Sequence, residues 1–147
     1  MQSLATSQRG KETRSAVTSV GSRLTSRQLT ILIVFGLVFW LVAALYIRFA
    51  PFGAFDRGPS TMLLYTITVP AAWISVQVAK RLAMLAADQL LPGVAIASAA
   101  AMLCDGIGLV WWPLYGEADR LPGAAWLLWG VGMILIAAFV EARRQGS

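Results

Sequence analysis

The sequence predicts an all-α integral membrane protein whose four transmembrane helices pack as one compact bundle. The chain of 147 residues is 58% hydrophobic and only 13% charged, with a mean hydropathy of +0.69. In soluble domains roughly a quarter of all residues are charged, about twice the share in this chain. A helix needs about 20 apolar residues to cross a bilayer, and four nearly uncharged stretches are that long. The predicted spans are about 29–49, 60–79, 90–115 and 122–140.

Residues 1–28 have a different composition from the spans. They are rich in Ser, Thr, Gln and Arg, and Glu12 is their one acidic residue. Such a segment has too little apolar surface to fold alone. We expect a disordered basic cytoplasmic tail near anionic lipid headgroups. An organellar transit peptide has the same composition and is the alternative.

Local signals mark the two middle helices. Ser60 follows a proline and is a candidate N-cap for the second helix, and Asp88 can cap the third. Pro70 lies in the middle of the second span. Because proline lacks a backbone N–H and clashes with the preceding turn, we expect a kink there.

Proline and glycine also mark the turn between the last two helices. Pro113 and Gly116 are predicted to end the third helix, and Pro122 and Gly123 to open the fourth. The spans are continuously apolar instead of alternating, which favours helices over a β-barrel.

The lysine and arginine residues are divided unequally between the two ends of such a bundle. Nine lie in the N-terminal tail, in the connection after the second span and in residues 141–147, and three lie in the other two loops. Cytoplasmic segments carry an excess of these residues. We therefore expect an integral membrane protein with both termini in the cytoplasm.

Asp105 is a charged residue within the third span. A carboxylate inside a membrane is costly and normally faces the protein interior or water. Arg48, near the outer end of the first span, is the expected partner, because both helices run outward. We predict an intramembrane ion pair that locks these two helices together. A protonatable or ion-binding carboxylate, or an Asp105 alone in a water-filled dip, are the alternatives.

Small residues surround Asp105 at helical spacing. Ala97, Ala101 and Gly108 share a helix face with it, and stripes of small residues allow close helix packing in bilayers. On the second span, Thr66, Pro70, Trp73 and Gln77 form a polar face at spacings of four, three and four. We expect this face to make interhelical hydrogen bonds, with a substrate path as the alternative.

Aromatic residues gather at the predicted outer interface. They include Tyr46, Trp111, Trp112, Tyr115 and Trp126. An aromatic belt at the level of the lipid headgroups explains most of them. The alternative is an outward pocket for a lipid tail or a quinone, with Arg48 and Asp105 beneath it.

The residue inventory excludes several kinds of chemistry. The chain has no histidine and a single cysteine, Cys104, so it cannot form an internal disulfide or a thiolate cluster. No metal-ligand spacing, phosphate loop or nucleophile–base pair occurs. We expect no metal, no cofactor and no catalytic site. The basic tail lacks interleaved aromatic residues, so we also expect no nucleic-acid partner.

Residues 31–140 resemble a family of small bacterial four-helix membrane proteins known as a domain of unknown function. The resemblance follows five segments. They are Phe39-Trp40 through Arg48-Phe49, Leu91-Pro92-Gly93, Cys104-Asp105-Gly106, Trp112-Pro113-Leu114-Tyr115 and Ala125-Trp126-Leu127-Leu128-Trp129-Gly130. It implies the four-span topology, draws attention to Arg48 and Asp105, and implies no activity. The basic N-terminal tail departs from the family's pattern.

These observations favour a membrane protein without catalytic equipment, either an accessory or structural subunit or a lipid-interacting protein. Its expected partners are the bilayer and either a larger membrane complex or further copies of itself. Two alternatives stay open. One is a small transporter or ion path that uses Asp105, and the other is a membrane enzyme that handles a lipid or a quinone.

Overall fold

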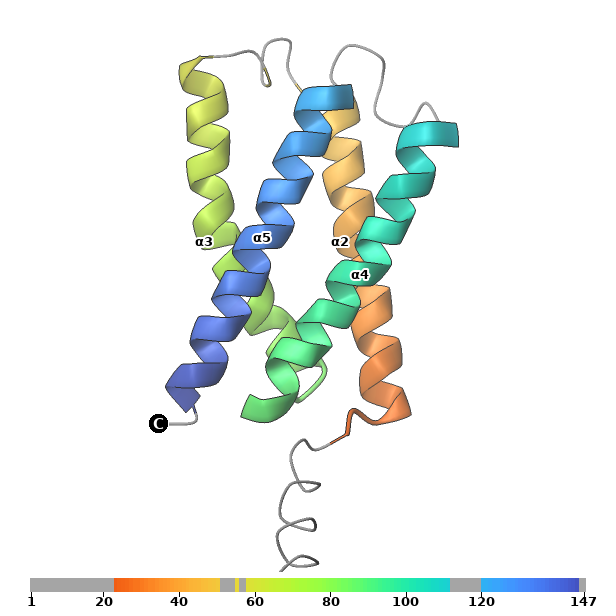
Figure 1. The fold of residues 1–147 in the computed structure, drawn as a ribbon, viewed down its shortest axis with the longest axis vertical. Helices are drawn as coiled ribbons and strands as arrows, with labels where there is room; N and C mark the ends of the chain where they lie inside the picture. The colour runs from red at the N-terminus through yellow and green to blue at the C-terminus, as the bar shows by residue number, and fades with distance from the viewer. Residues whose placement is uncertain (1–22, 51–54, 56–57, 112–119, 146–147) are drawn as a thin grey trace, which may run out of the picture.

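The protein is a bundle of four long helices. The computed structural model describes residues 23–50, 55, 58–111 and 120–145, and its helices are α2 (Ser26–Phe49), α3 (Pro59–Leu82), α4 (Ala87–Trp111) and α5 (Arg120–Gln145) (Figure 1). Each is long and apolar enough to cross a membrane. The described residues contain no strand. The predicted all-α, four-span fold is therefore confirmed, and it indicates an integral membrane protein.

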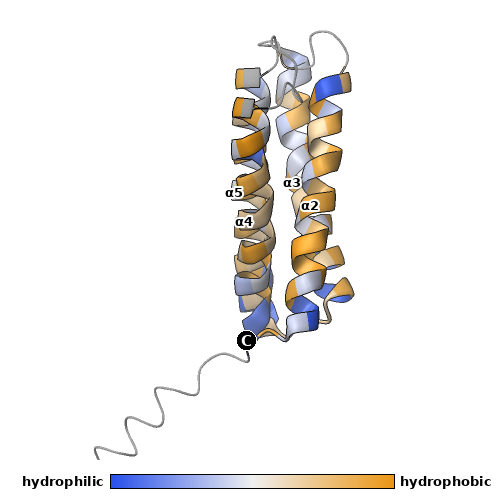
Figure 2. Cartoon of the chain, turned by 90° about the vertical axis from the view of Figure 1, so that its right-hand side faces the viewer, coloured by the Kyte–Doolittle hydropathy of each residue, from blue (hydrophilic) through white to orange (hydrophobic). Residues whose placement is uncertain are grey.

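The helices lie in two layers. Figure 2 shows α2 and α3 side by side in one layer and α4 and α5 in the other. Extensive contacts join α2 to α4, α4 to α5 and α5 to α3, whereas α2 and α3 barely touch. The ring of helices is therefore closed on three sides and open between α2 and α3.

The first two helices begin earlier than the predicted spans. Thr25 caps α2, because its hydroxyl accepts a hydrogen bond from the Gln28 backbone N–H while the Gln28 side chain accepts one from the Thr25 N–H. The boundary predicted after residue 28 followed hydropathy, and this polar capping box lies just outside the apolar stretch. At α3 the N-cap is Gly58, followed by Pro59 at the first helical position. The expected N-cap at Ser60 was wrong.

The other two helices differ from their predicted spans in a similar way. Asp88 lies inside the first turn of α4 instead of capping it, where its carboxylate interacts favourably with the helix dipole. The predicted end of the third span, at Pro113 to Gly116, lies outside the described residues. Helix α5 continues to Gln145, five residues beyond the predicted span, because Arg143 and Arg144 suit the last turn of a helix although they are not apolar.

Helix α3 contains Pro70 at its centre and continues through it. In Figure 1 the axis of α3 changes direction about half-way along its length. The kink expected from this proline agrees with that view. The upper half of α3 diverges from α2, which widens the opening between the two helices toward that end of the bundle.

The core consists of two packed clusters, one toward each end. The larger cluster includes Leu32, Val76 and Leu90, each at most 1% exposed. The smaller one consists of Ala44, Ile47 and Phe55. Four residues of the larger cluster also line the smaller of the two pockets described below: Val76, Ala79, Val94 and Ala97.

Helices α2 and α4 pack tightly against each other at Gly36. A Cβ atom added to Gly36 would lie 2.3 Å from the backbone oxygen of Ala97. Only glycine fits at such a distance, so Gly36 sets the spacing between these two helices. Ala97 is itself 6% exposed and belongs to the larger core cluster.

Two glutamine side chains join the start of α2 to the α3–α4 turn. Gln28 Nε2 donates to the Ala83 carbonyl and to Gln89 Oε1, both at 3.1 Å, and Gln89 Nε2 donates to the Arg23 carbonyl at 3.4 Å. Gln89 is only 8% exposed, so its amide is a buried polar centre. The turn contains Met84 at a φ of 49°, a conformation that costs a non-glycine residue energy.

One end of the bundle collects the basic residues. Helices α2 and α4 begin there, and α3 and α5 end there (Figure 1). We call it the basic end; its described lysine and arginine residues are Arg23, Arg27, Lys80, Arg81, Arg143 and Arg144. The unequal division of charge along the sequence thus corresponds to one physical end of the molecule.

Candidate functional site: a lateral cavity beside Asp105

The carboxylate of Asp105 accepts a hydrogen bond from an indole. Trp40 Nε1 on α2 lies 2.7 Å from Asp105 Oδ1 on α4. The Asp105 side chain is half-buried. This bond joins α2 to α4 within the membrane-spanning region. The partner expected from the sequence was Arg48, and a hydrogen bond from the Trp40 indole to Asp105 was not predicted.

Arg48 lies two helical turns beyond Trp40 on the same helix. Its side chain is exposed, and its guanidinium carbon is 6.0 Å from the centre of the Phe49 ring. The ion pair between Arg48 and Asp105 stays a prediction. In the structure a neutral donor, the Trp40 indole, is hydrogen-bonded to Asp105.

Asp105 and Trp40 form part of the wall of a cavity of about 390 Å³. Helices α2 and α3 form its two sides, and α4 and α5 form its floor. Val42 and Ile67 line it at the opening between α2 and α3, and their side chains are 61% and 54% exposed. We call it the lateral cavity, because it opens on the side of the bundle that would face lipid. Its size is within the range of small-molecule pockets, roughly 300–1,000 Å³.

The wall of the lateral cavity is almost entirely apolar, and Trp40, Asp105, Thr68 and Trp126 in it form hydrogen bonds. Trp126 Nε1 on α5 donates to Thr68 Oγ1 on α3 at 2.8 Å, and that hydroxyl donates to the Leu64 carbonyl at 2.8 Å. This bond is the interhelical contact that the sequence analysis expected from Thr66. The Thr66 side chain is instead exposed and donates to the Met62 carbonyl of its own helix. Thr66 and Thr68 are two residues apart, so they lie on different faces of α3.

An aromatic cluster covers the end of the cavity away from the basic end. Tyr46 and Trp126 both line the cavity, and their ring centres are 5.4 Å apart. Phe55 packs against both rings and is 6% exposed. Two of the aromatic residues assigned to an outer belt therefore pack against each other. The Trp111 side chain, Trp112 and Tyr115 lie outside what the structure describes.

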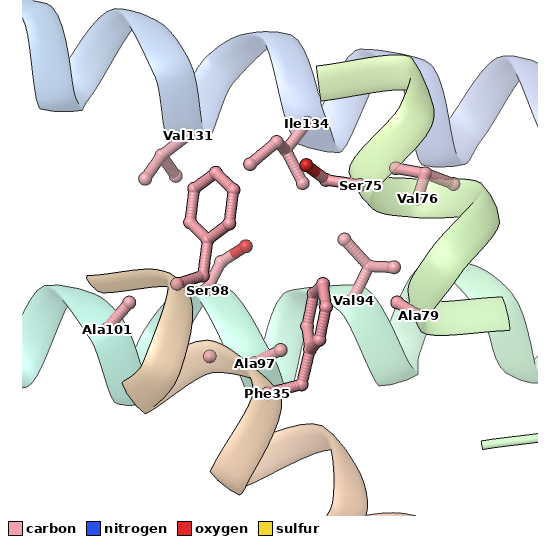
Figure 3. Close-up of a pocket in the computed structure, with 12 residues that line it drawn as sticks. Phe35, Ser75, Val76, Ala79, Val94, Ala97, Ser98, Ala101, Val131 and Ile134 are labelled. Carbon is pink, nitrogen blue, oxygen red and sulfur yellow. The ribbon is translucent and has the colours of Figure 1, made fainter. Parts of the chain in front are cut away.

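A second, smaller pocket lies closer to the basic end. It has a volume of about 40 Å³ and is lined from all four helices (Figure 3). Phe35, Val94 and Val131 point toward its centre, and Ser75 and Ser98 contribute the hydroxyl groups. We call it the inner pocket. Four of its lining residues also line the lateral cavity: Phe39, Ala101, Val131 and Ile134. The two spaces are thus neighbours along the α2–α3 opening.

The predicted stripe of small residues faces the bundle interior. Ala97 and Ala101 are 6% and 9% exposed, and Gly108 is buried. Ala97 contacts Gly36 of α2, and Ala101 lines both pockets. The stripe therefore has two roles, since it packs against α2 and leaves open space where its side chains are short.

The predicted polar face of α3 divides into two parts. Pro70 is exposed, as Thr66 is. Nearer the basic end, Gln77 lies close to Glu141 of α5, and Trp73 lies against Arg144, whose guanidinium carbon is 5.2 Å from a ring centre. Lys80 forms an ion pair with Glu141 at 3.0 Å. The part of this face near the basic end therefore joins α3 to α5.

The described part of the chain contains no group of three or more histidine, cysteine, aspartate or glutamate residues that could hold a metal ion. The Cys104 thiol is half-buried beside Asp105 in sequence. The arrangement offers an apolar space with a hydrogen-bonded carboxylate and hydroxyl at its wall. Such a space can hold an apolar molecule and orient one polar end.

Comparisons with known proteins give no relative for this chain, because no family model, no curated protein and no solved structure matches it. The resemblance to a family of four-helix membrane proteins stays a prediction.

Proposed function

We propose that the chain is a non-catalytic protein of a bacterial cytoplasmic membrane that binds an apolar, lipid-derived molecule in its lateral cavity. The single observation that carries this proposal is the apolar cavity of about 390 Å³ at the α2–α3 opening. In a membrane, lipid chains surround this side of the bundle. The occupant nearest to the opening is therefore an acyl or isoprenoid chain.

The shape of the site favours a chain over a compact ligand. Along α3 the lining of the lateral cavity runs from Leu64 to Ala72. At 1.5 Å per residue these positions are about 12 Å apart. An elongated apolar molecule can follow this length, and its polar end can meet the hydrogen-bonding groups at Asp105 or Thr68.

The orientation belongs to the same proposal. The basic end carries the excess of lysine and arginine, so we place it, with both termini, on the cytoplasmic side. The lateral cavity then lies toward the outer leaflet. The binding protein can act alone, as an accessory subunit of a larger complex or as a homo-oligomer, since lipid binding is compatible with each.

Photochemical labelling tests the proposal. The protein is reconstituted with phosphatidylcholine that carries a photoreactive group at mid-chain, and labelled residues are mapped by mass spectrometry. We expect label on half-buried cavity residues such as Thr68 and Leu127, as well as on the exposed helix faces. The fully buried Leu90 lies in the core and outside the cavity, so it should stay unlabelled.

Matched variants make this test specific. Ala71 lines the cavity from α3, so Ala71→Phe should fill the opening and remove the label from Thr68 and Leu127. Ala95 is an exposed alanine of α4 outside the cavity, and Ala95→Phe should leave the labelling pattern unchanged. Label confined to exposed residues in the wild type, or equal patterns in the two variants, would refute lipid binding in the cavity.

A further inference from the structure

A second surface of the molecule lies at the basic end, where α3 and α5 finish together. Six residues define it, and we call it the α3–α5 corner: Trp73, Gln77, Lys80, Arg81, Glu141 and Arg144. The lateral cavity opens in the other half of the bundle, so binding at the α3–α5 corner does not depend on what the cavity binds.

One carboxylate organises this corner. Lys80 Nζ lies 3.0 Å from Glu141 Oε1, and Gln145 Nε2 donates to the same oxygen at 2.7 Å. The Glu141 side chain is only 12% exposed. Lys80 and Glu141 balance each other's charge, and these contacts hold the last turns of α3 and α5 next to each other.

The arginines of the corner are exposed beside this pair. Arg81 directly follows Lys80, and its side chain is exposed. Trp73, Gln77 and Arg81 are spaced by four residues, so they share one face of α3. Since Trp73 contacts Arg144 and Gln77 contacts Glu141, this face of α3 lies toward the end of α5. Arg81 and Arg144 are therefore exposed cations on the side of the bundle where α3 and α5 meet.

The position of Arg144 relative to the bilayer is informative. Trp73 precedes Lys80 by seven residues, which is about 10 Å along the helix toward the membrane interior. The Arg144 guanidinium lies over the Trp73 ring at 5.2 Å. Its side chain thus reaches back from the end of α5 toward the membrane. A guanidinium stacked on an aromatic face keeps its N–H donors at the edge, where they can bind a phosphate.

The charges of the basic end are not spread evenly. At the ends of α3 and α5 the described residues include four cations and one acid: Lys80, Arg81, Arg143, Arg144 and Glu141. At the starts of α2 and α4 they include two cations and one acid: Arg23, Arg27 and Asp88. Among the described residues of the basic end, the excess positive charge is therefore concentrated at the α3–α5 corner.

From this geometry we infer that the α3–α5 corner binds the phosphate of an anionic membrane phospholipid, through Arg81 and Arg144. Helix α3 has 24 residues, or about 36 Å at 1.5 Å per residue. That length exceeds a hydrocarbon core of roughly 30 Å, so the last turn lies at the level of the headgroups. The Trp73 ring then lies beside the first part of the acyl chains.

A lipid titration tests this inference. The protein is purified in a neutral detergent and titrated with phosphatidylglycerol or with phosphatidylcholine of the same acyl chains. Bound lipid is counted by native mass spectrometry, and the midpoint of thermal unfolding is measured in parallel. We expect phosphatidylglycerol to bind more tightly than phosphatidylcholine and to raise the midpoint further. Equal binding of the two lipids would overturn the inference.

Two double variants separate a defined site from diffuse attraction. Arg81→Gln/Arg144→Gln should weaken phosphatidylglycerol binding by about five-fold for each arginine lost, or roughly 25-fold together. Arg23→Gln/Arg27→Gln removes the same charge from the other corner of the basic end and should retain the wild-type affinity. Equal losses in the two double variants would show diffuse attraction and overturn the site.

Two further arms complete the experiment. Unfolding in phosphatidylcholine alone shows whether each variant is folded. If the Arg81/Arg144 double variant does not fold, each single variant gives the same comparison, with an expected loss of about five-fold. Inorganic phosphate should give neither binding nor protection. If it protects as well as the lipid does, and through the same arginines, the corner is a site for a soluble anion and the inference is wrong.

Discussion

Replacing Gly36 by alanine tests the tight packing of α2 against α4. The added Cβ would lie 2.3 Å from the Ala97 backbone oxygen, 0.7 Å inside the 3.0 Å that real Cβ contacts essentially never cross. That oxygen belongs to the α4 backbone and cannot rotate away as a side chain can. Helix α2 must therefore move outward as a body and loosen its packing against α4.

The expected cost follows from two opposing effects. Overpacking a tight interior contact costs about 1–3 kcal/mol, and a backbone obstacle favours the upper part of that range. Alanine in place of glycine in a helix contributes about 1 kcal/mol of stability. We expect Gly36→Ala to lower the free energy of unfolding by about 2 kcal/mol, the difference between these two values.

Gly132→Ala is the matched control. Gly132 also lies inside a helix, and a Cβ atom added there meets nothing within 4 Å. It should leave the free energy of unfolding unchanged or raise it by up to about 1 kcal/mol. Unfolding is followed by tryptophan fluorescence in mixed micelles of increasing sodium dodecyl sulfate. Equal stability of the two glycine variants would refute the close approach of α2 and α4.

Three other predictions concern polar contacts between helices, and each is checked by the same unfolding assay. Gln89→Leu should lower the free energy of unfolding by about 1–3 kcal/mol, because it leaves the buried partners of that amide unsatisfied. An unchanged free energy of unfolding would show that the Gln28 and Gln89 hydrogen bonds do not stabilise the fold. Trp126→Phe and Thr68→Val should each cost about 1 kcal/mol, and the double variant should cost less than their sum, whereas additive losses would argue against their hydrogen bond. If Arg48 and Asp105 pair as predicted, replacing either by alanine leaves a charge unpaired and the double variant again costs less than the sum; strictly additive shifts would exclude the pair.

The fold was predictable because its main determinants are local in the sequence. The length of each uncharged stretch fixed the number of helices, and the distribution of lysine and arginine identified one end of the bundle. Hydropathy marks the apolar part of a helix and not its polar ends, so the capping box at Thr25 and the last turn of α5 extended beyond the predicted spans.

The candidate site was predictable only in part, because it depends on how each helix is rotated about its axis. The sequence indicated Asp105, and it offered an outward pocket near Tyr46 and Trp126 only as the alternative to an aromatic belt. It did not indicate that Trp40 would donate to Asp105, since an indole is not an obvious partner for a charge. Choosing Thr66 over Thr68 on α3 required knowledge of which face meets α5, and periodicity alone did not provide it.

The measurement that tests the central claim most directly is native mass spectrometry of the protein extracted from its own membrane in a mild detergent. The wild type and Ala95→Phe should retain an apolar molecule of defined mass, and Ala71→Phe should be released without it. A bare wild-type protein, equal retention by the two variants, or a stoichiometric protein partner lost only from Ala71→Phe would contradict a lipid-binding lateral cavity.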